Sequence, residues 1–338
     1  MKAMLLAGGL STRLYPLTRS VPKPLVPVAG VPNAVHLINY LKSHGYDEIA
    51  INVHYLAGAI TQRLGDGSAF GVRLEYLHEE TLMGSAGALK PMEAFFGDET
   101  FVVVGCDDLT DLPLDRVVRL HEEKRAVATI GLVKRDEVDQ YGVVVTESDG
   151  RITGFQEKPA PGTERSKLVN TGIYVFSRAI FDRIPAATFY DFGKQVFPEL
   201  LAGDLPFYGF DAKDAYWCDI GTPSEYRRAS ADVVNGRFTI PNTRGSGADP
   251  TATIAASANV DRNVWIGANA RVGEHVRIIG PSVIGNGVTI EDRAVVEASI
   301  IWENSTIGGG ATLRNSIVGR DYLVAPSLAL TGEVVAPG

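Results

Sequence analysis

The chain is poor in cysteine, with only Cys106 and Cys218 among its 338 residues. Two cysteines are too few for a disulfide framework and suit a reducing compartment. Each one immediately precedes an aspartate, Asp107 and Asp219. We interpret both cysteines as small buried residues at strand ends and keep a thiol pair beside a metal site as the alternative.

Long hydrophobic runs and an excess of positive charge are also missing. The apolar runs are far shorter than a bilayer span, and the chain enters a strand directly, without the pattern of a signal peptide. The net charge of −8 argues against nucleic acid or an anionic membrane as a partner. We therefore expect a soluble, cytoplasmic protein that holds any polyanionic substrate through local cations and metal.

Apolar residues make up 45% of the chain, enough for a large α/β core plus a second module. Short apolar runs alternate with helical repeats, which predicts a doubly wound, mostly parallel sheet with its ligand at the carboxyl ends of the strands. An Asp-Gly turn at 149–150 also indicates antiparallel pairing in the second half. The expected strands are 4–7, 48–53, 72–77, 100–104, 126–133, 142–146, 151–156, 168–176, 205–210 and 216–220, and the expected helices are 33–44, 57–64, 86–96, 114–123, 178–183, 192–201 and 223–234.

The first strand ends in a glycine loop that is followed by spaced cations. Gly8 and Gly9 let the backbone approach a ligand closely, and Arg13 and Lys23 bring positive charge to the same strand end. Exposed backbone N–H groups and cations together describe a cradle for a polyphosphate. The simpler alternative is a glycine turn with two solvated cations.

The sequence around the two glycines favours the polyphosphate cradle over a simple glycine turn, because residues 8–18 read GGLSTRLYPLT and residues 22–24 read PKP. It closely resembles the signature of the sugar nucleotidyltransferases, the nucleotide-sugar pyrophosphorylases. Ser11 departs from the family's usual glycine, and its Cβ narrows the backbone angles open to the loop. The resemblance implies that a nucleoside triphosphate binds at Leu6, Ala7, Gly8, Gly9, Ser11, Thr12 and Arg13.

A second segment, residues 78–87 (HEETLMGSAG), resembles the family's base-binding loop, with Leu82-Met83 where the family has Pro-Leu. The resemblance implies that Glu79 reads the base edge and that Gly84 and Ser85 contact the nucleotide. A carboxylate only accepts hydrogen bonds, so Glu79 suits guanine, which donates from N1 and N2, better than thymine or uracil. We take this to favour GTP, with a solvated acidic loop as the simpler alternative.

Two predicted strand ends carry aspartates. Residues 105–109 (GCDDL) and 216–223 (YWCDIGTP) resemble the family's metal motifs, which implies Mg²⁺ ligands at Asp107 and Asp219. Asp108 is the alternative ligand or a supporting group. Adjacent carboxylates at a strand end could simply cap the next turn, but burying them without a cation is costly.

Three later segments, YGVV at 141–144, FQEKP at 155–159 and NTGIY at 170–174, resemble the family's sugar-phosphate site. The resemblance implies that Glu157 holds sugar hydroxyls and Lys158 the sugar phosphate. Neighbours on a strand point to opposite faces, so one inward and one solvated side chain is the simpler alternative. Supporting contacts are expected from Gly142, Asn170 and Thr171.

The C-terminal quarter has a six-residue repeat. Beyond a Gly- and Pro-rich stretch, an apolar residue recurs at every sixth position from Ile254 to Val296 and, after a slip of one, at Ile301, Ile307 and Leu313. This period predicts a hexapeptide β-helix of triangular coils, with about four coils. Its left-handedness is implied by the resemblance. The predicted domains are 1–235 (catalytic), 236–250 (linker) and 251–338 (β-helix).

The resemblance, which is nearest to the mannose-1-phosphate guanylyltransferases, implies that a sugar 1-phosphate attacks the α-phosphorus of a nucleoside triphosphate. We expect GTP and mannose 1-phosphate as substrates, with Arg13, Lys23 and Lys158 as catalytic cations; glucose 1-phosphate with UTP, dTTP or ATP stays open. A non-catalytic regulatory subunit is one rival. Another is an acyltransferase in the β-helix, where His275 stands alone. We expect a homo-oligomer.

Overall fold

A computed structural model describes residues 1–240 and 244–337, and contacts within it divide the chain into two units. The first unit comprises Met1–Gly9 and Leu37–Trp217. The second comprises Leu10–His36 and Cys218–Gly338. By its contacts the signature is therefore divided: Gly8 and Gly9 belong to the first unit, whereas the rest of it groups with the C-terminal third of the chain.

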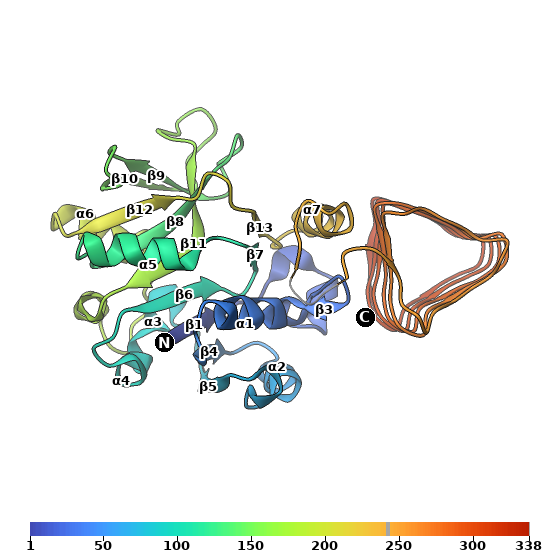
Figure 1. Ribbon diagram of the computed structural model, residues 1–338, viewed down its shortest axis with the longest axis horizontal. Coiled ribbons are helices and arrows are strands. Elements are labelled where there is room, and N and C mark those ends of the chain that lie inside the picture. The colour runs from blue at the N-terminus through green and yellow to red at the C-terminus, as the bar shows by residue number, and fades with distance from the viewer. Residues whose placement is uncertain (241–243, 338) are drawn as a thin grey trace. The chain divides into compact units, whose positions relative to one another are not determined.

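The first unit is built on a nine-stranded mixed sheet. Its parallel half has the order β6-β1-β4-β5 (Figure 1). Fully buried residues such as Met4, Ile49 and Val103 give these strands the continuous apolar runs of a sheet covered on both faces. The strands are β1 (Lys2–Leu6), β4 (Glu48–Val53), β5 (Arg73–His78) and β6 (Phe101–Gly105).

Antiparallel strands complete this sheet. Strand β11 pairs antiparallel with β6, β8 and β9, β10 pairs antiparallel with β9, and β12 runs parallel to β8. The buried ring of Phe176 packs in the core of this unit, stacked on Phe192 and tilted against Phe101. The antiparallel hairpin predicted across the Asp-Gly turn is confirmed. The strands are β8 (Ala128–Lys134), β9 (Gly142–Thr146), β10 (Ile152–Glu157), β11 (Leu168–Phe176) and β12 (Phe207–Asp211).

Helices and turns connect these strands, and α5 packs on β8, β11 and β12. The α-helices are α1 (Asn33–Ser43), α2 (Ala57–Leu64), α3 (Gly84–Gly87), α4 (Glu93–Phe96), α5 (Leu114–Glu123), α6 (Phe197–Ala202) and α7 (Pro223–Val234). Short strands are β2 (Pro27–Val28), β3 (Val31–Pro32), β7 (Asp108–Thr110) and β13 (Trp217–Asp219). The tighter 3₁₀ turns are Thr12–Leu14, Leu17–Arg19, Lys23–Leu25, Ser68–Phe70, Lys90–Met92 and Arg178–Arg183.

Three predicted helices differ from the structure, and the one expected at 178–183 is a 3₁₀ helix. The helix expected at 86–96 is broken into α3, a 3₁₀ turn and α4, because Pro91 has no N–H to donate and its ring clashes with the carbonyl four residues earlier. The helix expected at 192–201 starts as a π turn, Phe192–Val196, and continues as α6, with Pro198 in its first turn. The predicted strands 48–53, 142–146 and 168–176 match the structure at both ends, and the ends of the other predicted strands differ by one or two residues.

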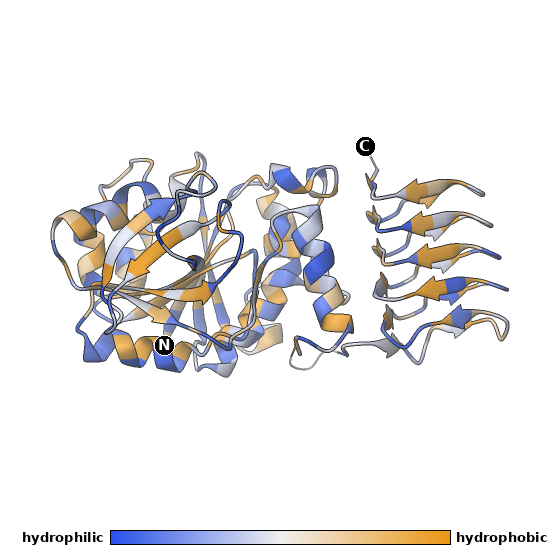
Figure 2. Ribbon diagram, turned by 90° about the horizontal axis from the view of Figure 1, so that it is seen from above, coloured by the Kyte–Doolittle hydropathy of each residue, from blue (hydrophilic) through white to orange (hydrophobic). Residues whose placement is uncertain are grey.

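The second unit contains the predicted left-handed parallel β-helix, whose triangular cross-section is seen end-on in Figure 1. Figure 2 shows its coils stacked like rungs. One sheet has the order β14-β17-β20-β23-β26-β29, a second β15-β18-β21-β24-β27 and the third β16-β19-β22-β25-β28. The strands are β14 (Gly247–Ala248), β15 (Thr253–Ile254), β16 (Asn259–Val260), β17 (Val264–Ile266), β18 (Arg271–Val272), β19 (Arg277–Ile279), β20 (Ser282–Ile284), β21 (Thr289–Ile290), β22 (Val295–Glu297), β23 (Ile300–Ile301), β24 (Thr306–Ile307), β25 (Thr312–Arg314), β26 (Ile317–Val318), β27 (Leu323–Val324), β28 (Ala329–Thr331) and β29 (Val334–Val335).

The expectation of about four coils is too low. Within the described residues two of the sheets have five strands and one has six, so there are about five coils. Equivalent positions are 18 residues apart in the early coils (Ala268 to Asn286) and 17 apart later (Ser282 to Ser299). This shortening explains the slip in the six-residue phase. The repeat continues through Val318 and Val324, past the last position that the strict period identified.

The stretch expected as a linker lies between α7 and the first coil. Strand β14 is inside its last residues, and 241–243, together with Gly338 at the end of the predicted β-helix, lie outside the described residues. Among the residues the structure describes, no helix is long and apolar enough to cross a membrane.

Candidate active site

In the first unit, three neighbouring parallel strands end side by side. Leu6 at the end of β1 pairs with Asn52 of β4 on one side and with Gly105 of β6 on the other. Beyond Leu6 the chain leaves the sheet, and the Ala7 N–H donates to Asn52 Oδ1 over 2.9 Å. The glycine turn, Asn52 and the loop before Asp107 therefore meet at one sheet edge, as expected for the ligand end of such a sheet.

Glu79 is fixed at this edge next to the glycine turn. Its Oε2 accepts from Asn52 Nδ2 over 2.6 Å, and its Oε1 accepts from the Met83 N–H over 3.1 Å. A Cβ on Gly8 would lie 2.8 Å from both Asn52 Nδ2 and Glu79 Oε2. The position therefore requires glycine, because any side chain would displace the pair. Glu79 is partly buried, so it is an organised carboxylate and not a solvated loop residue.

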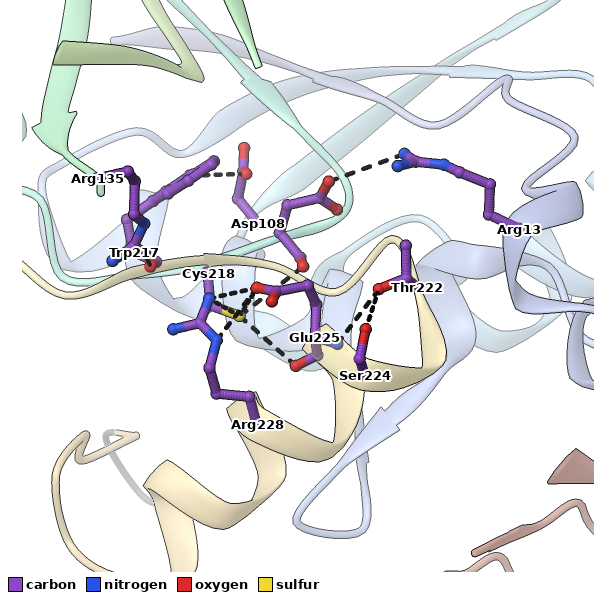
Figure 3. A network of polar contacts seen from close by, with 10 residues as sticks. Arg13, Asp108, Arg135, Trp217, Cys218, Thr222, Ser224, Glu225 and Arg228 are labelled. Carbon is purple, nitrogen blue, oxygen red and sulfur yellow. Dashed lines mark hydrogen bonds and ion pairs between the residues drawn. The ribbon is translucent and has the colours of Figure 1, made fainter. Parts of the chain in front are cut away.

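The two adjacent aspartates after β6 have different environments. Asp108 is 2% exposed, and its Oδ1 accepts from Trp217 Nε1 over 2.9 Å (Figure 3). The same indole N–H also lies 2.8 Å from the Thr171 carbonyl oxygen. Asp107 is partly exposed in the loop between β6 and β7. Asp108 thus holds the loop together, while Asp107 is the more accessible of the two. Among the described residues, no group of three or more His, Cys, Asp or Glu side chains is arranged to hold a metal ion.

In the second unit, the signature loop is bent at Ser11. This residue has φ 55° and ψ 41°, the left-handed region that glycine adopts without strain. The Ser11 carbonyl accepts from Thr18 Oγ1 over 2.8 Å and from the Leu14 N–H over 3.2 Å. These two bonds hold the serine where the family has glycine. The serine therefore keeps the glycine geometry, and the cost of the strained residue is about 1 to 2 kcal/mol.

The same unit brings Lys23, Arg13 and Asp219 together. Lys23 Nζ donates to Asp219 Oδ1 over 3.3 Å, and Arg13 Nη2 lies 3.8 Å from Asp219 Oδ2. The side chains of Lys23 and Asp219 are only 11% and 18% exposed, whereas Arg13 is 51% exposed. One carboxylate is therefore shared by a buried cation and an accessible one. Asp107 belongs to the first unit and Asp219 to the second.

The loop that carries Gly84 and Ser85 is anchored by Asp191. Ser85 Oγ donates to Asp191 Oδ2 over 3.0 Å and accepts from the Phe192 N–H over 3.0 Å. Gly84 has φ 77°, and a Cβ there would lie 2.4 Å from the Tyr190 carbonyl oxygen. Gly84 is thus required for close packing, and the Ser85 hydroxyl is already engaged within the protein.

The expected sugar residues lie around β9, β10 and β11. Gly142 faces Glu157 across the β9–β10 pair, and a Cβ on Gly193 would lie 2.7 Å from Glu157 Oε2. This crowding partly desolvates the carboxyl group although the residue is exposed. Desolvation, and then the Asp191 carboxylate, raise the pKa of Glu157 above its usual range against the opposing charge of Lys158. Lys158 is exposed, with φ 45°, so its side chain is available to a ligand.

Asn170 and Thr171 make bonds within the protein. Asn170 Nδ2 donates to the Tyr174 hydroxyl over 3.0 Å, and its Oδ1 accepts from the Gly172 N–H over 2.9 Å. Thr171 is buried, and its Oγ1 donates to the Gly131 carbonyl over 2.7 Å. These two side chains therefore shape the strand that presents the site.

Two residues of this region, Asn52 and Asp191, were not identified from the sequence, and a third, Trp217, was identified only as part of the motif around Asp219. Asn52 links Ala7 to Glu79, Asp191 holds Ser85, and Trp217 holds Asp108. Asn52 could have been found, because it is the one polar side chain in the apolar run IAINV. Asp191 gave no such signal, since its partner Ser85 lies 106 residues away. The motif that contains Trp217 did not reveal its bond to Asp108, which lies 109 residues away.

Cys106 and Cys218 are both buried thiols. Cys218 lies at the start of the second unit beside α7, where Arg228 Nη2 donates to its sulfur over 3.3 Å and Glu225 Oε2 lies 3.7 Å away (Figure 3). The Cys218 thiol thus lies against the Glu225–Arg228 ion pair of α7.

Residues 2–236 match the nucleotidyl transferase family, and residues 246–338 match the GMPPB C-terminal domain. A UTP–glucose-1-phosphate uridylyltransferase from Synechocystis is 40% identical over 96% of this chain and 88% of its own length. A mannose-1-phosphate guanylyltransferase from Mycobacterium tuberculosis is 35% identical over 87% of this chain and 82% of its own. Another, from Arabidopsis thaliana, is 32% identical over 100% of this chain and 96% of its own.

A crystal structure from Bacillus anthracis, described as that of a glucose-1-phosphate thymidylyltransferase, is similar in fold, with a TM-score of 0.61 and 27% identity. The likeness covers 68% of this chain and 94% of that one. The relatives' names differ in sugar and base but share one reaction class. The chain therefore belongs to the nucleotidyl transferase family and, within it, is a sugar-1-phosphate nucleotidyltransferase, which transfers a nucleotidyl group from a nucleoside triphosphate to a sugar 1-phosphate.

Proposed function

We propose that the protein transfers a guanylyl group from GTP to mannose 1-phosphate, giving GDP-mannose and pyrophosphate. The observation that carries this choice is Glu79, a carboxylate fixed by Asn52 and the Met83 N–H beside Gly8. Each carboxylate oxygen can accept a second hydrogen bond, and guanine donates from both N1 and N2. Relatives named as mannose-1-phosphate guanylyltransferases at 35% and 32% identity support the same choice.

A glucose-1-phosphate uridylyltransferase is the second candidate, because the relative with that name is 40% identical. Uracil presents one N–H donor between two carbonyl acceptors, so its edge calls for a partner that both donates and accepts. The Glu79 carboxylate offers acceptors alone. The base therefore separates the two candidates better than the sugar does.

Catalysis in this proposal is positioning plus neutralisation of charge. The phosphate oxygen of the sugar attacks the α-phosphorus in line with the departing pyrophosphate, so no side chain needs to act as nucleophile. Both substrates are anions, and the main barrier is their repulsion together with the charge that develops on the phosphoryl oxygens. We assign Arg13 to the β- and γ-phosphates, and Lys23 and Lys158 to the reacting centre.

Mg²⁺ is proposed as the cofactor, held by Asp107 and Asp219. Carboxylate oxygens are hard ligands that suit this ion, which binds proteins through one or two carboxylates and takes its other ligands from phosphates and water. The partial exposure of Asp107 beside the buried Asp108 supports its choice as the ligand. When bound, the ion would neutralise phosphate charge. Lys23 and Arg13 supply positive charge next to Asp219 from the chain itself.

For the sugar, we propose that Glu157 accepts hydroxyl groups and Lys158 binds the phosphate. The accessible Lys158 side chain next to a partly desolvated carboxyl group supports this division. Gly142 keeps the space clear, because a Cβ there would lie 2.6 Å from the Phe155 ring.

The test is a matrix of GTP, UTP, dTTP and ATP against mannose and glucose 1-phosphates, read as kcat/KM for pyrophosphate release. We expect GTP with mannose 1-phosphate to give the highest value. The variant Glu79→Gln should lose about 10- to 100-fold of kcat/KM with GTP while losing less with UTP, because the amide replaces one acceptor by a donor. Glu80→Gln, an exposed neighbour, is the matched control.

A highest value with UTP and glucose 1-phosphate would replace the proposal by the second candidate. Absence of pyrophosphate release with every pair would favour a non-catalytic regulatory subunit. We also propose a homo-oligomer assembled through the β-helix, supported by Leu323 and Leu328, which are 65% and 42% exposed on its late coils. A monomeric mass by light scattering would refute it.

A further inference from the structure

Within the second unit, the segment that carries Lys23 is packed against the β-helix. Gly30, in the turn between β2 and β3, has φ 71° and lies under the ring of Trp265 from β17. A Cβ on Gly30 would be only 2.2 Å from the Trp265 ring carbon Cη2. Trp265 is itself buried, although it faces away from the core of the coil. The β-helix therefore has an aromatic contact with residues 23–30, which we call the signature segment.

A second contact runs through Tyr226 on α7. Its hydroxyl donates to the Pro27 carbonyl over 2.5 Å and accepts from Trp302 Nε1 over 2.9 Å. The rings of Tyr226 and Trp302 meet edge to face, with centroids 6.3 Å apart. Both side chains are fully buried, and burial raises the pKa of Tyr226 so that the hydroxyl keeps its proton. One hydroxyl thus joins α7, the β-helix and the signature segment.

The two segments that meet at this hydroxyl are those that carry Lys23 and Asp219. On one side, Pro27 follows Lys23 by four residues, and the Val26 N–H donates back to the Lys23 carbonyl over 3.0 Å. This bond closes a tight turn between the lysine and Pro27, so a shift of Pro27 would be passed on to Lys23.

On the other side, Tyr226 is in the first turn of α7, shortly after Asp219. The Tyr226 N–H donates to the Thr222 carbonyl over 2.9 Å, and Thr222 Oγ1 caps the helix by accepting from the Glu225 N–H. The capped turn ties the hydroxyl rigidly to the end of β13. Each partner of the 3.3 Å Lys23–Asp219 contact is therefore linked to Tyr226 by a short segment that is held by backbone hydrogen bonds.

We propose that Tyr226, held by Trp302 of the β-helix, is a positioning residue that keeps Lys23 and Asp219 in the relative placement that nucleotidyl transfer requires. The inference rests on the roles proposed above for these two residues. It makes the β-helix part of the framework of the active site, in addition to any role in assembly. Tyr226 is not expected to contact either substrate, because its hydroxyl, the one polar group of its side chain, is hydrogen-bonded to Trp302 and Pro27.

The experiment compares Tyr226→Phe, Trp302→Phe and the double variant in the full-length protein, with the best substrate pair from the matrix. Tyr226→Phe removes both bonds of the hydroxyl, and Trp302→Phe removes one. Small displacements of catalytic groups are costly, so we expect kcat to fall about 10- to 100-fold in Tyr226→Phe with both KM values changed less than about twofold. The double variant should be no slower than Tyr226→Phe alone.

Ser305→Ala is the matched control, because it too removes a buried hydroxyl of the second unit. Ser305 Oγ donates to the Gly319 carbonyl over 2.6 Å and accepts from the Tyr322 N–H over 3.1 Å, both within the β-helix. A purely structural role of Tyr226 would give both variants a lower Tm and leave kcat, measured well below the Tm, unchanged in both. The proposal requires that kcat fall only in Tyr226→Phe.

Lys23→Ala, measured in parallel, distinguishes failure of the positioning role of Tyr226 from failure of the proposed function. If Lys23→Ala loses turnover but folded Tyr226→Phe keeps kcat within twofold, the positioning role is overturned and the proposed function stands. If Lys23→Ala keeps turnover, the proposed role of the lysine fails first. Should Tyr226→Phe not fold, Trp302→Phe, which leaves the bond to Pro27, decides by the same criterion.

Discussion

Lys23 and Asp219 are 196 residues apart in the chain, yet Lys23 Nζ lies 3.3 Å from Asp219 Oδ1. Both side chains are mostly buried, so the pair is screened far less than an ion pair on the surface. Removing one partner would leave the other in a poorly solvated place. The fold thus holds the lysine side chain in a fixed orientation beside the carboxylate.

The first prediction concerns the lysine. Lys23→Ala should lower kcat by about 100- to 1000-fold, the usual effect of removing one group that stabilises charge in the transition state. Far-UV circular dichroism should be unchanged, since Arg13 remains beside Asp219. Lys213→Ala, which removes an exposed lysine, is the control and should keep normal turnover. Near-normal turnover in Lys23→Ala would remove the residue from the mechanism.

The second prediction concerns the divalent cation. Pyrophosphate release should stop in EDTA and return with added Mg²⁺, because the two anionic substrates repel each other. Asp107→Asn should raise the Mg²⁺ concentration needed for half-maximal rate by at least about tenfold, as it removes one charged ligand. Asp98→Asn, at a highly exposed aspartate, is the control. An unchanged Mg²⁺ dependence in Asp107→Asn would point to Asp108 as the ligand.

Much of the fold could be predicted because its signals are local. Apolar runs placed the strands of the sheet, Thr222 and Pro223 placed the start of α7, and a six-residue period placed the β-helix. What could not be predicted depends on distant partners. Nothing near Tyr226 in the sequence points to Trp302. The helix expected at 86–96 is a different case, because Pro91, which breaks it, is a local signal to which the prediction gave too little weight.

The candidate site shows the same limit. Its sequence motifs identified Arg13, Lys23 and Asp219, which the structure brings together in one unit. The motifs could not show that Thr171 and Asn170 are engaged inside the protein, because those bonds go to Gly131, Gly172 and Tyr174 through the sheet. A motif names residue types, whereas availability to a ligand depends on what else packs nearby.

The third prediction concerns stability in mild acid. Burial lowers the pKa of His36 to about 4, despite a hydrogen bond from its Nε2 to the Val28 carbonyl, and lowers the pKa of His121 to about 4 as well. An unfolded histidine titrates near 6.5, so between pH 6.5 and 4 the unfolded chain binds more protons than the folded one. Stability should therefore fall as the pH drops through this window, by about 2 kcal/mol per histidine at pH 5.

Urea unfolding at pH 7.5 and pH 5 measures this loss. In His121→Gln the difference between the two pH values should shrink by the share of that histidine, and His275→Gln, at an exposed histidine, should leave it unchanged. An equal loss of stability between pH 7.5 and pH 5 in the unmodified protein, His121→Gln and His275→Gln would show that His121 is not buried in its neutral form.

The fourth prediction concerns Gly30, and Gly236 supplies its control. The two glycines have nearly the same φ, 71° and 72°, but only Gly30 faces the Trp265 ring. Apart from the chain neighbours, no heavy atom of the described residues lies within 4 Å of a Cβ built on Gly236. Gly236→Ala should therefore cost about 1 kcal/mol of stability, from backbone strain alone. Gly30→Ala adds a steric clash, and should cost roughly 2 kcal/mol more. Because the β2–β3 turn follows Lys23, Gly30→Ala should also lower kcat, and Gly236→Ala should not. Equal losses of stability and unchanged kcat in both variants would mean that the Trp265 ring moves aside easily, and that its contact with the signature segment does not hold that segment in place.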